Sequence, residues 1–245
     1  MTRPSGPRLF LDADLSQSDV LLDERDAHYV GHVLRLKAGD RVTVFDGRGI
    51  ERAATVGLLS RRRSQLDLHD RLPTLPEAEL EITLVQALIK SDAMDLIVQK
   101  ITELGVRRLC AVHTDFSVVR LDGERSLRRV EHWRRIARSA CEQCGRHFPP
   151  AIEAYESLDV CLAELPVGAA RIVFDPRAPS LCELASTPAA VCLLVGPEGG
   201  LSAADGELAR IAGFETASLG PRTLRAETAA LAACTAAQLR WGDMR

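Results

Sequence analysis

A glycine-rich loop that carries one carboxylate is the first candidate for chemistry in this sequence. The segment 196–200 reads Gly-Pro-Glu-Gly-Gly and follows an apolar run at 190–195 that is typical of a strand covered on both faces. Glycine has no Cβ, so the backbone can approach a ligand closely, and Glu198 adds a carboxylate. Ser202 is expected to cap the helix at 203–212. The alternative is an ordinary tight turn, which three glycines in five residues disfavour.

A second loop repeats this order of strand, turn and helix. Residues 219–228 read LGPRTLRAET, with a Gly-Pro turn before the helix expected at 225–239. Arg225 and Glu227 stand at the start of that helix, from which polar side chains can point toward the first loop. Ligands of open α/β sheets bind beyond the carboxyl ends of the strands, so the two loops together predict one ligand site. A surface ion pair is the alternative for Arg225 and Glu227.

Other chemistry is poorly supported by the spacing of the residues. Neither loop matches GxGxxG or GxxxxGK[ST], so dinucleotide binding and a P-loop are not indicated. Cys141 and Cys144 form a lone CxxC late in an expected helix, and His28 and His32 share a helix face without a third ligand. We therefore expect no metal site, and no Ser-His-Asp arrangement is readable.

The elements that position the two loops alternate between strand and helix patterns. The expected strands span 80–88, 106–112, 170–174 and 190–195. The expected helices span 92–104, 125–144, 203–212 and 225–239. This alternation indicates an α/β domain with a mostly parallel sheet. The last helix is rich in alanine, which permits another backbone to pack closely against it, as a partner subunit would.

The first part of the chain has a different pattern, with short strands and one helix. Strands are expected at 8–11, 19–22, 41–45, 53–59 and 65–69, and a helix at 24–36. Such a series favours a small β-barrel. The segment LPTLPEAE contains two prolines and little that could pack. The sequence therefore predicts a barrel at 1–72, a linker at 73–79 and an α/β domain at 80–245.

Length and composition indicate a globular protein of the cytoplasm. The chain has 245 residues, of which 46% are hydrophobic and only 4% aromatic. Its start lacks a signal-peptide pattern, and no apolar run approaches the roughly 18 residues of a membrane span. The seven cysteines are scattered, and several stand in apolar runs, where a free thiol behaves as a small hydrophobe. We expect reduced thiols and no membrane partner.

Positive charge is concentrated in two stretches although the formal net charge is −3. Residues 35–71 contain nine Lys and Arg against five acids, and residues 120–146 contain eight Arg against four acids. Segregated positive charge suits phosphate contact, because neutralising phosphates releases condensed counterions. The alternative is a solvated face with internal ion pairs.

Taken together, GPEGGLS at 196–202 and LGPRTLRAET at 219–228 resemble the ribosomal small subunit methyltransferase E family. Its members are SPOUT-class enzymes that methylate ring nitrogen N3 of a uridine in 16S ribosomal RNA. The resemblance covers essentially the whole chain. Segments similar to the family's PUA-like RNA-binding barrel are Arg8-Leu9-Phe10, His32-Val33-Leu34-Arg35 and Gly39-Asp40. Segments similar to its central motifs are Gln86-Ala87-Leu88, Gln99-Lys100, Glu103-Leu104-Gly105-Val106 and Glu142-Gln143-Cys144-Gly145-Arg146.

The resemblance implies a fold, a cofactor and partners. It implies a trefoil knot in the C-terminal domain, a homodimer with the alanine-rich helix at the interface, and 16S ribosomal RNA within the small subunit as substrate. S-adenosylmethionine would be held by the backbone of Leu194, Val195, Gly196, Gly199, Gly200, Leu219, Gly220, Pro221 and Leu224. The RNA would be held by basic residues of the barrel and of both stretches, among them Arg8, Arg35, Arg61, Arg62, Arg63 and Arg146.

The implied reaction makes Arg225, Glu198 and Glu227 the catalytic candidates. Uridine N3 is a poor nucleophile while protonated, so the site must remove the proton or stabilise the uridinate. Arg225 is suited to the negative charge on O2 and O4, and either glutamate can accept the proton or orient Arg225. One departure is Phe116, which follows an acidic residue where the family often has Arg and cannot make that side chain's contacts. Another is Ser91, where the family commonly has Gly.

Other readings lead to different expectations. A non-catalytic RNA-binding or ribosome-assembly protein would have kept the fold and lost the chemistry, and the intact loops argue against it. A SPOUT methyltransferase with a different RNA target, such as a tRNA ribose, would keep fold and cofactor. A nucleotide-dependent oxidoreductase would need a dinucleotide fingerprint that this sequence lacks.

Overall fold

The computed structural model describes residues 6–60, 64–119, 123–184 and 187–244, which form two compact units. The first unit comprises Met1–Pro76 and Arg138–Pro149, and the second comprises Glu77–Ala137 and Pro150–Arg245. The domain predicted at 80–245 includes residues 138–149. The segment 138–149 belongs instead to the first unit, because its contacts are made there.

The first unit is built on a five-stranded sheet in the order β1-β3-β4-β5-β2. Its strands are β1 (Arg8–Phe10), β2 (Asp19–Leu22), β3 (Arg41–Phe45), β4 (Glu51–Leu59) and β5 (Ser64–Arg71). Strand β1 pairs with β3 in parallel, and the other neighbours are antiparallel. The register between β4 and β5 shifts twice, and such bulges bend a sheet. The result is a curled half-barrel with β1 and β2 at its two edges.

One helical segment covers the half-barrel, and it differs from the single helix expected at 24–36. Helix α1 (Glu24–His28) begins at Asp23, whose carboxylate accepts a 2.7 Å hydrogen bond from the Asp26 amide. The segment then widens into a π-helical turn, η1 (Tyr29–Val33), with i→i+5 bonding from the Leu34 amide to the Tyr29 carbonyl. Arg35 has a φ of 56°, which ends the helical path because side-chain-bearing residues rarely continue a helix from there.

The second unit is a six-stranded sheet in the order β11-β9-β10-β6-β7-β8, and all of its pairings are parallel. The strands are β6 (Glu81–Ala87), β7 (Arg108–Val112), β8 (Ala151–Tyr155), β9 (Ala170–Phe174), β10 (Ala190–Val195) and β11 (Glu215–Ala217). The helices are α2 (Ser91–Glu103), α3 (Gly123–Cys144), α4 (Leu158–Ala163), α5 (Ala203–Ile211) and α6 (Ala226–Trp241), with a short 3-10 helix η2 (Leu181–Glu183). Strand β8 and helix α4 were not expected from the sequence, because both are short.

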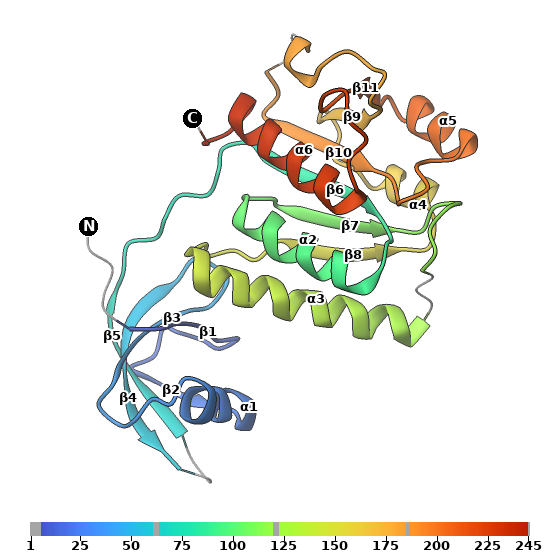
Figure 1. Ribbon diagram of the computed structural model, residues 1–245. Helices are drawn as coiled ribbons and strands as arrows, with labels where there is room; N and C mark the ends of the chain where they lie inside the picture. The colour runs from blue at the N-terminus through green and yellow to red at the C-terminus, as the bar shows by residue number, and fades with distance from the viewer. Residues whose placement is uncertain (1–5, 61–63, 120–122, 185–186, 245) are drawn as a thin grey trace. The chain divides into compact units, whose positions relative to one another are not determined.

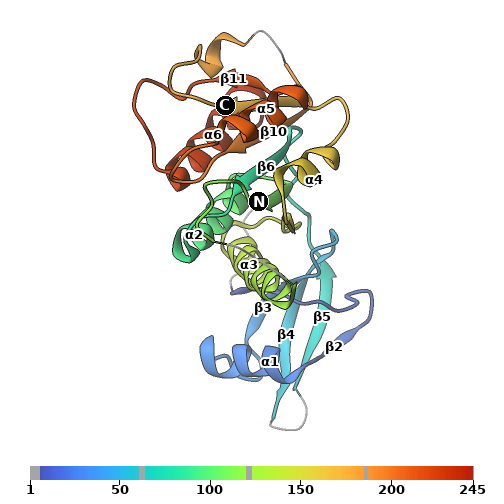
Figure 2. The ribbon, with the colours of Figure 1, turned by 90° about the vertical axis from the view of Figure 1, so that its right-hand side faces the viewer.

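Helices cover both faces of this sheet (Figures 1 and 2). On one face α2, α6 and the part of α3 before residue 138 pack against side chains such as Leu84 and Leu193. On the other face α4 and α5 pack against the adjacent residues Val85 and Leu194. Successive side chains of a strand point to opposite faces, so two covered faces require continuous apolar runs. This is why β6 and β10 were readable from the sequence.

Helix α6 returns across the sheet after the edge strand β11. It packs on β10, β6 and α2 through buried alanines such as Ala230, Ala233 and Ala237. Near its end, Gln238 donates a 2.9 Å hydrogen bond to the Leu104 carbonyl, just before β7 begins. The first turn of α6 therefore lies toward the opposite edge, where the carboxyl ends of the parallel strands meet. No helix in the described part of the chain is both long and apolar enough to cross a lipid bilayer.

Candidate functional site

The loop after β10 is a short, closed turn with little room for side chains. Gly200 has a φ of 76°, and its amide donates to the Pro197 carbonyl at 2.9 Å. A Cβ on Gly196 would lie 3.2 Å from the Gly200 carbonyl carbon and the Leu201 amide nitrogen, so a larger residue would displace the backbone. Glu198 is exposed on this loop. The loop therefore presents backbone rather than side chains to whatever occupies the edge of the sheet.

The helix after this loop begins with a reciprocal cap. Ser202 Oγ accepts a 3.0 Å hydrogen bond from the Asp205 amide, and the Asp205 carboxylate accepts one of 3.1 Å from the Ser202 amide. Asp205 is only 4% exposed. The prediction that Ser202 caps the helix is confirmed. The S-x-x-D spacing at 202–205 was the signal that could have identified Asp205 as well.

The same serine ties the loop after β10 to the loop after β7. Its Oγ donates a 2.6 Å hydrogen bond to the Asp115 carboxylate, and the Asp115 amide lies 3.4 Å from Asp205 Oδ2. Strand β6 stands between β7 and β10 in the sheet, so these bonds bridge its carboxyl end. The sequence analysis did not identify this link, because residues 87 positions apart in the chain give no local signal.

The second loop is anchored to the segment before η2. The Ser218 amide donates to the Pro179 carbonyl at 2.7 Å, and the Leu181 amide donates to the Ser218 carbonyl at 3.0 Å. Gly220 has a φ of 103°, a conformation that favours glycine. Leu219 and Leu224 are partly buried, and Pro221 is exposed. The loop is thus fixed at its start and reaches the first turn of α6 through a glycine-dependent bend.

Arg225 and Glu227 stand at the start of α6, as the sequence predicted. The Arg225 backbone caps the helix, since its carbonyl accepts from the Ala229 amide at 2.8 Å, while its side chain is exposed and makes no capping bond. Glu227 is partly buried in the first turn, where a carboxylate interacts favourably with the helix dipole. Among the described residues, no ion pair joins Arg225 to Glu227 or to Glu198. The alternative reading of Arg225 and Glu227 as a surface ion pair is therefore not supported by the described residues.

Two buried polar atoms remain unsatisfied at the same edge. Gln86 is fully buried near the end of β6, and its Nε2 donates a 2.9 Å hydrogen bond to the Ala87 carbonyl. Within the described residues its Oε1 has no hydrogen-bond partner, and neither has Nε2 of His113, just after β7. Gln86 pairs in register with Val195, the residue before the glycine loop. Buried polar atoms are normally satisfied, so this edge has acceptor capacity that a ligand can use.

The candidate RNA-binding residues differ in exposure. Arg35 is exposed and Arg146 is partly buried, while Arg61, Arg62 and Arg63 lie outside the described residues. Arg8 does not fit the expected RNA contact, because its side chain is only 7% exposed. Its guanidinium forms two hydrogen bonds with the Glu51 carboxylate, at 3.0 and 3.1 Å, and stacks 3.7 Å from the Phe45 ring centroid.

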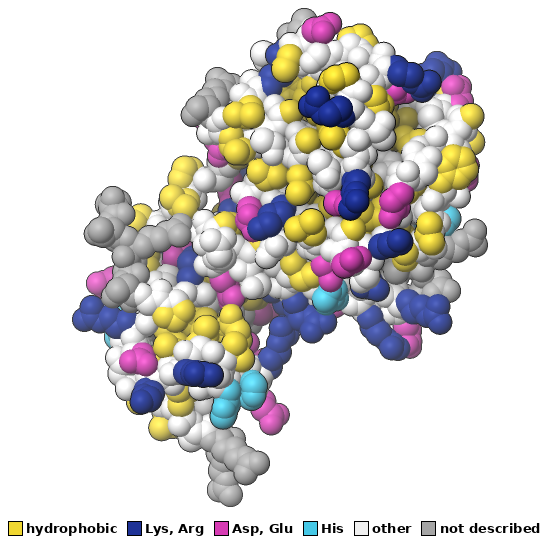
Figure 3. Space-filling model, in the orientation of Figure 1, with side chains coloured by type: hydrophobic (Ala, Val, Ile, Leu, Met, Phe, Trp, Pro, Cys, Tyr) yellow, Lys and Arg dark blue, Asp and Glu magenta, His cyan; other side chains and the backbone are white. Residues whose placement is uncertain are grey.

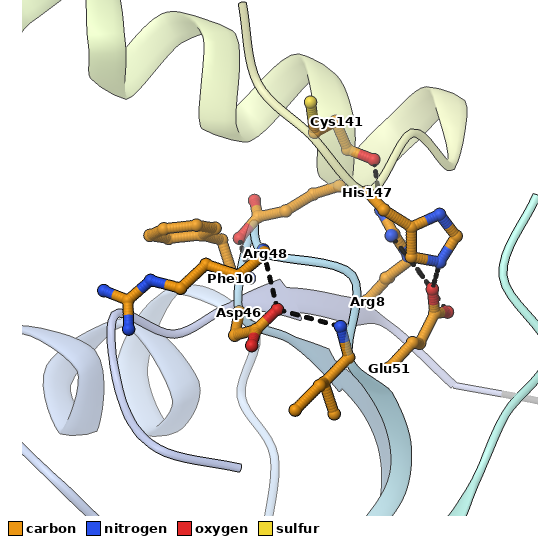
Figure 4. A network of polar contacts seen from close by, with 9 residues as sticks. Arg8, Phe10, Asp46, Arg48, Glu51, Cys141 and His147 are labelled. Carbon is orange, nitrogen blue, oxygen red and sulfur yellow. Dashed lines mark hydrogen bonds and ion pairs between the residues drawn. The ribbon is translucent and has the colours of Figure 1, made fainter. Parts of the chain in front are cut away.

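Glu51 is the centre of a buried polar network in the first unit. Figure 4 shows Arg8 and His147 both pointing at its carboxylate, and Arg8 also donates to the Cys141 carbonyl. Burial alone would raise the pKa of Glu51, but hydrogen bonds from His147 and Arg8 outweigh it and lower the pKa to about 2. Nearby, the Glu142 carboxylate accepts 3.0 Å from the Phe10 amide. These contacts hold the segment 138–149 in the first unit.

Comparisons with known proteins agree with this geometry. Residues 76–238 match the family described as an RNA methyltransferase domain, and residues 22–68 match an RNA methyltransferase PUA domain. The ribosomal RNA small subunit methyltransferase E of Buchnera aphidicola (subsp. Schizaphis graminum) is 30% identical over 97% of this chain and 98% of that protein. The protein of the same name from Mycobacterium bovis is 30% identical over 87% of this chain and 83% of that protein.

Two solved structures share the whole fold. The ribosomal RNA small subunit methyltransferase E of Neisseria gonorrhoeae, bound to S-adenosyl methionine, is 33% identical with a TM-score of 0.90 over 98% of this chain and 100% of that chain. A methyltransferase of Legionella pneumophila, in complex with the bound cofactor SAM, is 30% identical with a TM-score of 0.92 over the same shares. The fold class expected from the sequence, a PUA-like N-terminal unit before a SPOUT-type α/β unit, is confirmed.

Proposed function

Because the chain belongs to the ribosomal RNA small subunit methyltransferase E family, we propose that it methylates ring nitrogen N3 of a uridine in 16S ribosomal RNA, with S-adenosylmethionine as methyl donor. The observation that carries this proposal is the pair of loops at the carboxyl edge of the parallel sheet, 196–202 and 219–225, with unsatisfied polar atoms between β6 and β7. Ligands of open α/β sheets bind at this edge.

The residues of this edge fit S-adenosylmethionine. The glycine loop offers backbone without intervening Cβ atoms, and a Cβ built on Gly200 or Gly220 would meet no atom within 4 Å, so the backbone is accessible there. The orphaned Oε1 of Gln86 is a ready acceptor for an amine or hydroxyl donor. We assign the backbone of both loops, from Leu194 to Gly200 and from Leu219 to Leu224, to cofactor binding. When bound, the cofactor supplies a methyl group on a positively charged sulfonium.

Arg225 and the two glutamates would carry the proton and charge of the reaction. The N3 proton of uridine must leave before nitrogen can accept a methyl group. Glu198 on the glycine loop or Glu227 in the first turn of α6 would accept it, directly or through water. Negative charge then spreads to O2 and O4 of the base. The exposed guanidinium of Arg225, which no described carboxylate neutralises, is available to stabilise that charge.

Arginines of α3 are proposed to hold the RNA backbone. Arg125, Arg128, Arg134 and Arg135 are exposed, and Figure 3 shows Lys and Arg side chains gathered over this helix. Arg128 already pairs with Glu124 at 2.5 Å, so Arg125 and Arg135 are the stronger candidates. Binding to 30S subunits should weaken with rising salt, and Arg135→Ala should lower the salt dependence by about one phosphate contact. Arg210→Ala on α5 is the matched control, because Arg210 is exposed and paired with Glu207.

A substrate within the small ribosomal subunit would place the enzyme in the cytoplasm.

The outer face of α6 is proposed to form a homodimer interface. Leu239 is 55% exposed, and Ala229, Leu231 and Ala236 are only partly buried, so apolar residues surround this helix. A helix that is apolar on all sides is normally buried. Sedimentation should give a dimer for the wild type and a monomer for Leu239→Lys. Leu208→Lys on α5, at a position 37% exposed, should leave the dimer unchanged. A monomeric wild type would contradict this assignment.

The decisive experiment is methyl transfer to a defined substrate. Purified protein would be incubated with labelled S-adenosylmethionine and 30S subunits from a strain that lacks this modification, and the product would be mapped by mass spectrometry. A single N3-methyluridine in 16S RNA is the expected product. Label on another nucleoside would overturn the substrate and keep the fold and cofactor. Neither transfer nor cofactor binding would favour the non-catalytic RNA-binding alternative.

A further inference from the structure

One aromatic side chain, that of Phe116, is exposed and belongs to none of the apolar clusters of the described residues. The chain has six Phe, two Tyr and two Trp, all within the described residues. Only Phe116 among these ten is exposed, at 51%. Single exposed apolar residues are common on protein surfaces, so the importance of Phe116 depends on where the fold places it.

Phe116 is held in a tight turn after β7. The Ser117 amide donates a 3.0 Å hydrogen bond to the Thr114 carbonyl, and the Ser117 hydroxyl accepts one of 3.2 Å from the Thr114 amide. On the N-terminal side of Phe116, the Asp115 carboxylate accepts a 2.6 Å hydrogen bond from Ser202 Oγ. Both neighbours of Phe116 are therefore fixed by hydrogen bonds, and the ring is presented from a defined backbone position.

The side chain lies against the glycine loop. A Cβ built on Gly199 would be 3.2 Å from Phe116 Cβ, which makes Phe116 a direct neighbour of the segment assigned to the cofactor. The ring thus has one side near the loop backbone and a large part of its surface open. Asp115, which precedes Phe116, and Glu198, which precedes Gly199, are exposed carboxylates. They would repel a phosphate and leave an uncharged, flat group as the suitable occupant.

We infer that Phe116 is a stacking platform for an unpaired nucleobase of the substrate RNA at the mouth of the methyl-transfer site. The inference rests on the proposed function, because N3 lies on the pairing edge of uridine and the target must be unpaired to be reached. Unpaired RNA bases stack on aromatic side chains, and removal of such a ring typically weakens binding by about 5- to 150-fold. The stacked base is either the target uridine or its immediate neighbour, which share this chemistry.

Kinetics with three substitutions tests the role of the ring. Phe116→Ala should raise KM for 30S subunits about tenfold or more, while the Kd for S-adenosylmethionine and the melting temperature stay unchanged. Phe116→Tyr should restore KM, and Phe116→Leu should restore only part of it because it is apolar without a π-face. Val118→Ala is the matched control, since Val118 is 77% exposed in the same loop and has no ring.

A fluorescence assay separates this inference from the proposed function. RNA with 2-aminopurine at the target position or beside it should be quenched by the wild type and not by Phe116→Ala, and the quenched position identifies the stacked base. This assay reads binding whether or not methyl transfer occurs. Equal KM values for Phe116→Ala and Val118→Ala, or equal quenching with and without the ring, would overturn the stacking role. A loss of cofactor affinity or of dimer in Phe116→Ala would assign the ring to the loop or to a subunit contact instead.

Discussion

The two units use arginine and glutamate in opposite ways. In the first unit Arg8 and Glu51 are buried, paired and joined by His147 (Figure 4). At the carboxyl edge of the second unit Arg225 and Glu198 are exposed and share no ion pair among the described residues. Where charges satisfy one another, they hold the fold together. Where charges are exposed and a buried atom such as Gln86 Oε1 has no partner among the described residues, the donors and acceptors remain available to a ligand.

This contrast separates two arginines that the sequence placed in the same machinery. Both Arg8 and Arg225 belong to segments that resemble the same family, and both were assigned to substrate chemistry from the sequence. The structure commits three of the five N–H donors of Arg8 to Glu51 and the Cys141 carbonyl, and it leaves the side chain only 7% exposed, so a phosphate has little access to it. Arg225 keeps its donors available at the start of α6.

The largest effect is expected from breaking the buried pair. Arg8→Met leaves Glu51 buried without its main cation, so the free energy of unfolding should fall by about 3–5 kcal/mol in chemical denaturation. Arg48→Met is the control, because the Arg48–Asp12 pair is exposed and should be worth less than about 1 kcal/mol. Equal effects of the two substitutions would show that the network is not structural.

Removal of Arg225 should act on catalysis instead. Arg225→Ala should lower kcat for methyl transfer by about 100- to 1000-fold, because it removes a cation preorganised for the uridinate oxygens, and it should leave the melting temperature unchanged. Arg222→Ala, three residues earlier in the same exposed loop, should retain most activity. Wild-type turnover in Arg225→Ala would remove this residue from the catalytic set.

The pH dependence of stability should report Glu51. Its pKa is about 2 in the folded chain and near 4.5 when unfolded, so the network stabilises the fold above pH 4.5 and this contribution disappears as pH falls toward 2. The difference is worth about 3 kcal/mol. The free energy of unfolding should be measured for the wild type and Glu51→Gln between pH 7 and pH 3. The difference between the two proteins should become smaller as the pH falls. A difference that does not change with pH would contradict the lowered pKa of Glu51.

The smallest effect is expected at Ser202, which caps α5 and links the loop after β10 to the loop after β7. Ser202→Ala should cost about 1 kcal/mol of stability through loss of the cap. It should also weaken S-adenosylmethionine binding several-fold in calorimetry, because Ser202 ties Asp115 to the glycine loop. Asp23→Ala removes the N-cap of α1 in the first unit and should cost stability alone. Equal cofactor affinity in both variants would separate the link from the cofactor site.

Much of the fold was predictable because its signals are local. Strands β2, β3, β9 and β10 have the predicted bounds, and the helix after the glycine loop begins at the predicted cap. The predicted helix at 24–36 was too long, because apolar spacing alone does not distinguish a π-helical turn from an α-helix. The helical path also ends at Arg35, whose φ is positive. Strand β8 was missed because Ile152 is its one buried residue at the edge of the sheet, so it has no continuous apolar run, and helix α4 was missed because six residues cover less than two helical turns.

The sequence by itself determined the two loops, the helix that follows each and the resemblance that identifies the family, because each depends on residues adjacent in the chain. Tertiary structure alone decided that Arg8 is buried, that Asp115 bonds to Ser202, that Phe116 lies against Gly199, and that the segment 138–149 joins the first unit. These outcomes depend on contacts between residues tens of positions apart. Whether a charge is paired or free is set by what packs beside it, and a linear pattern does not contain that information.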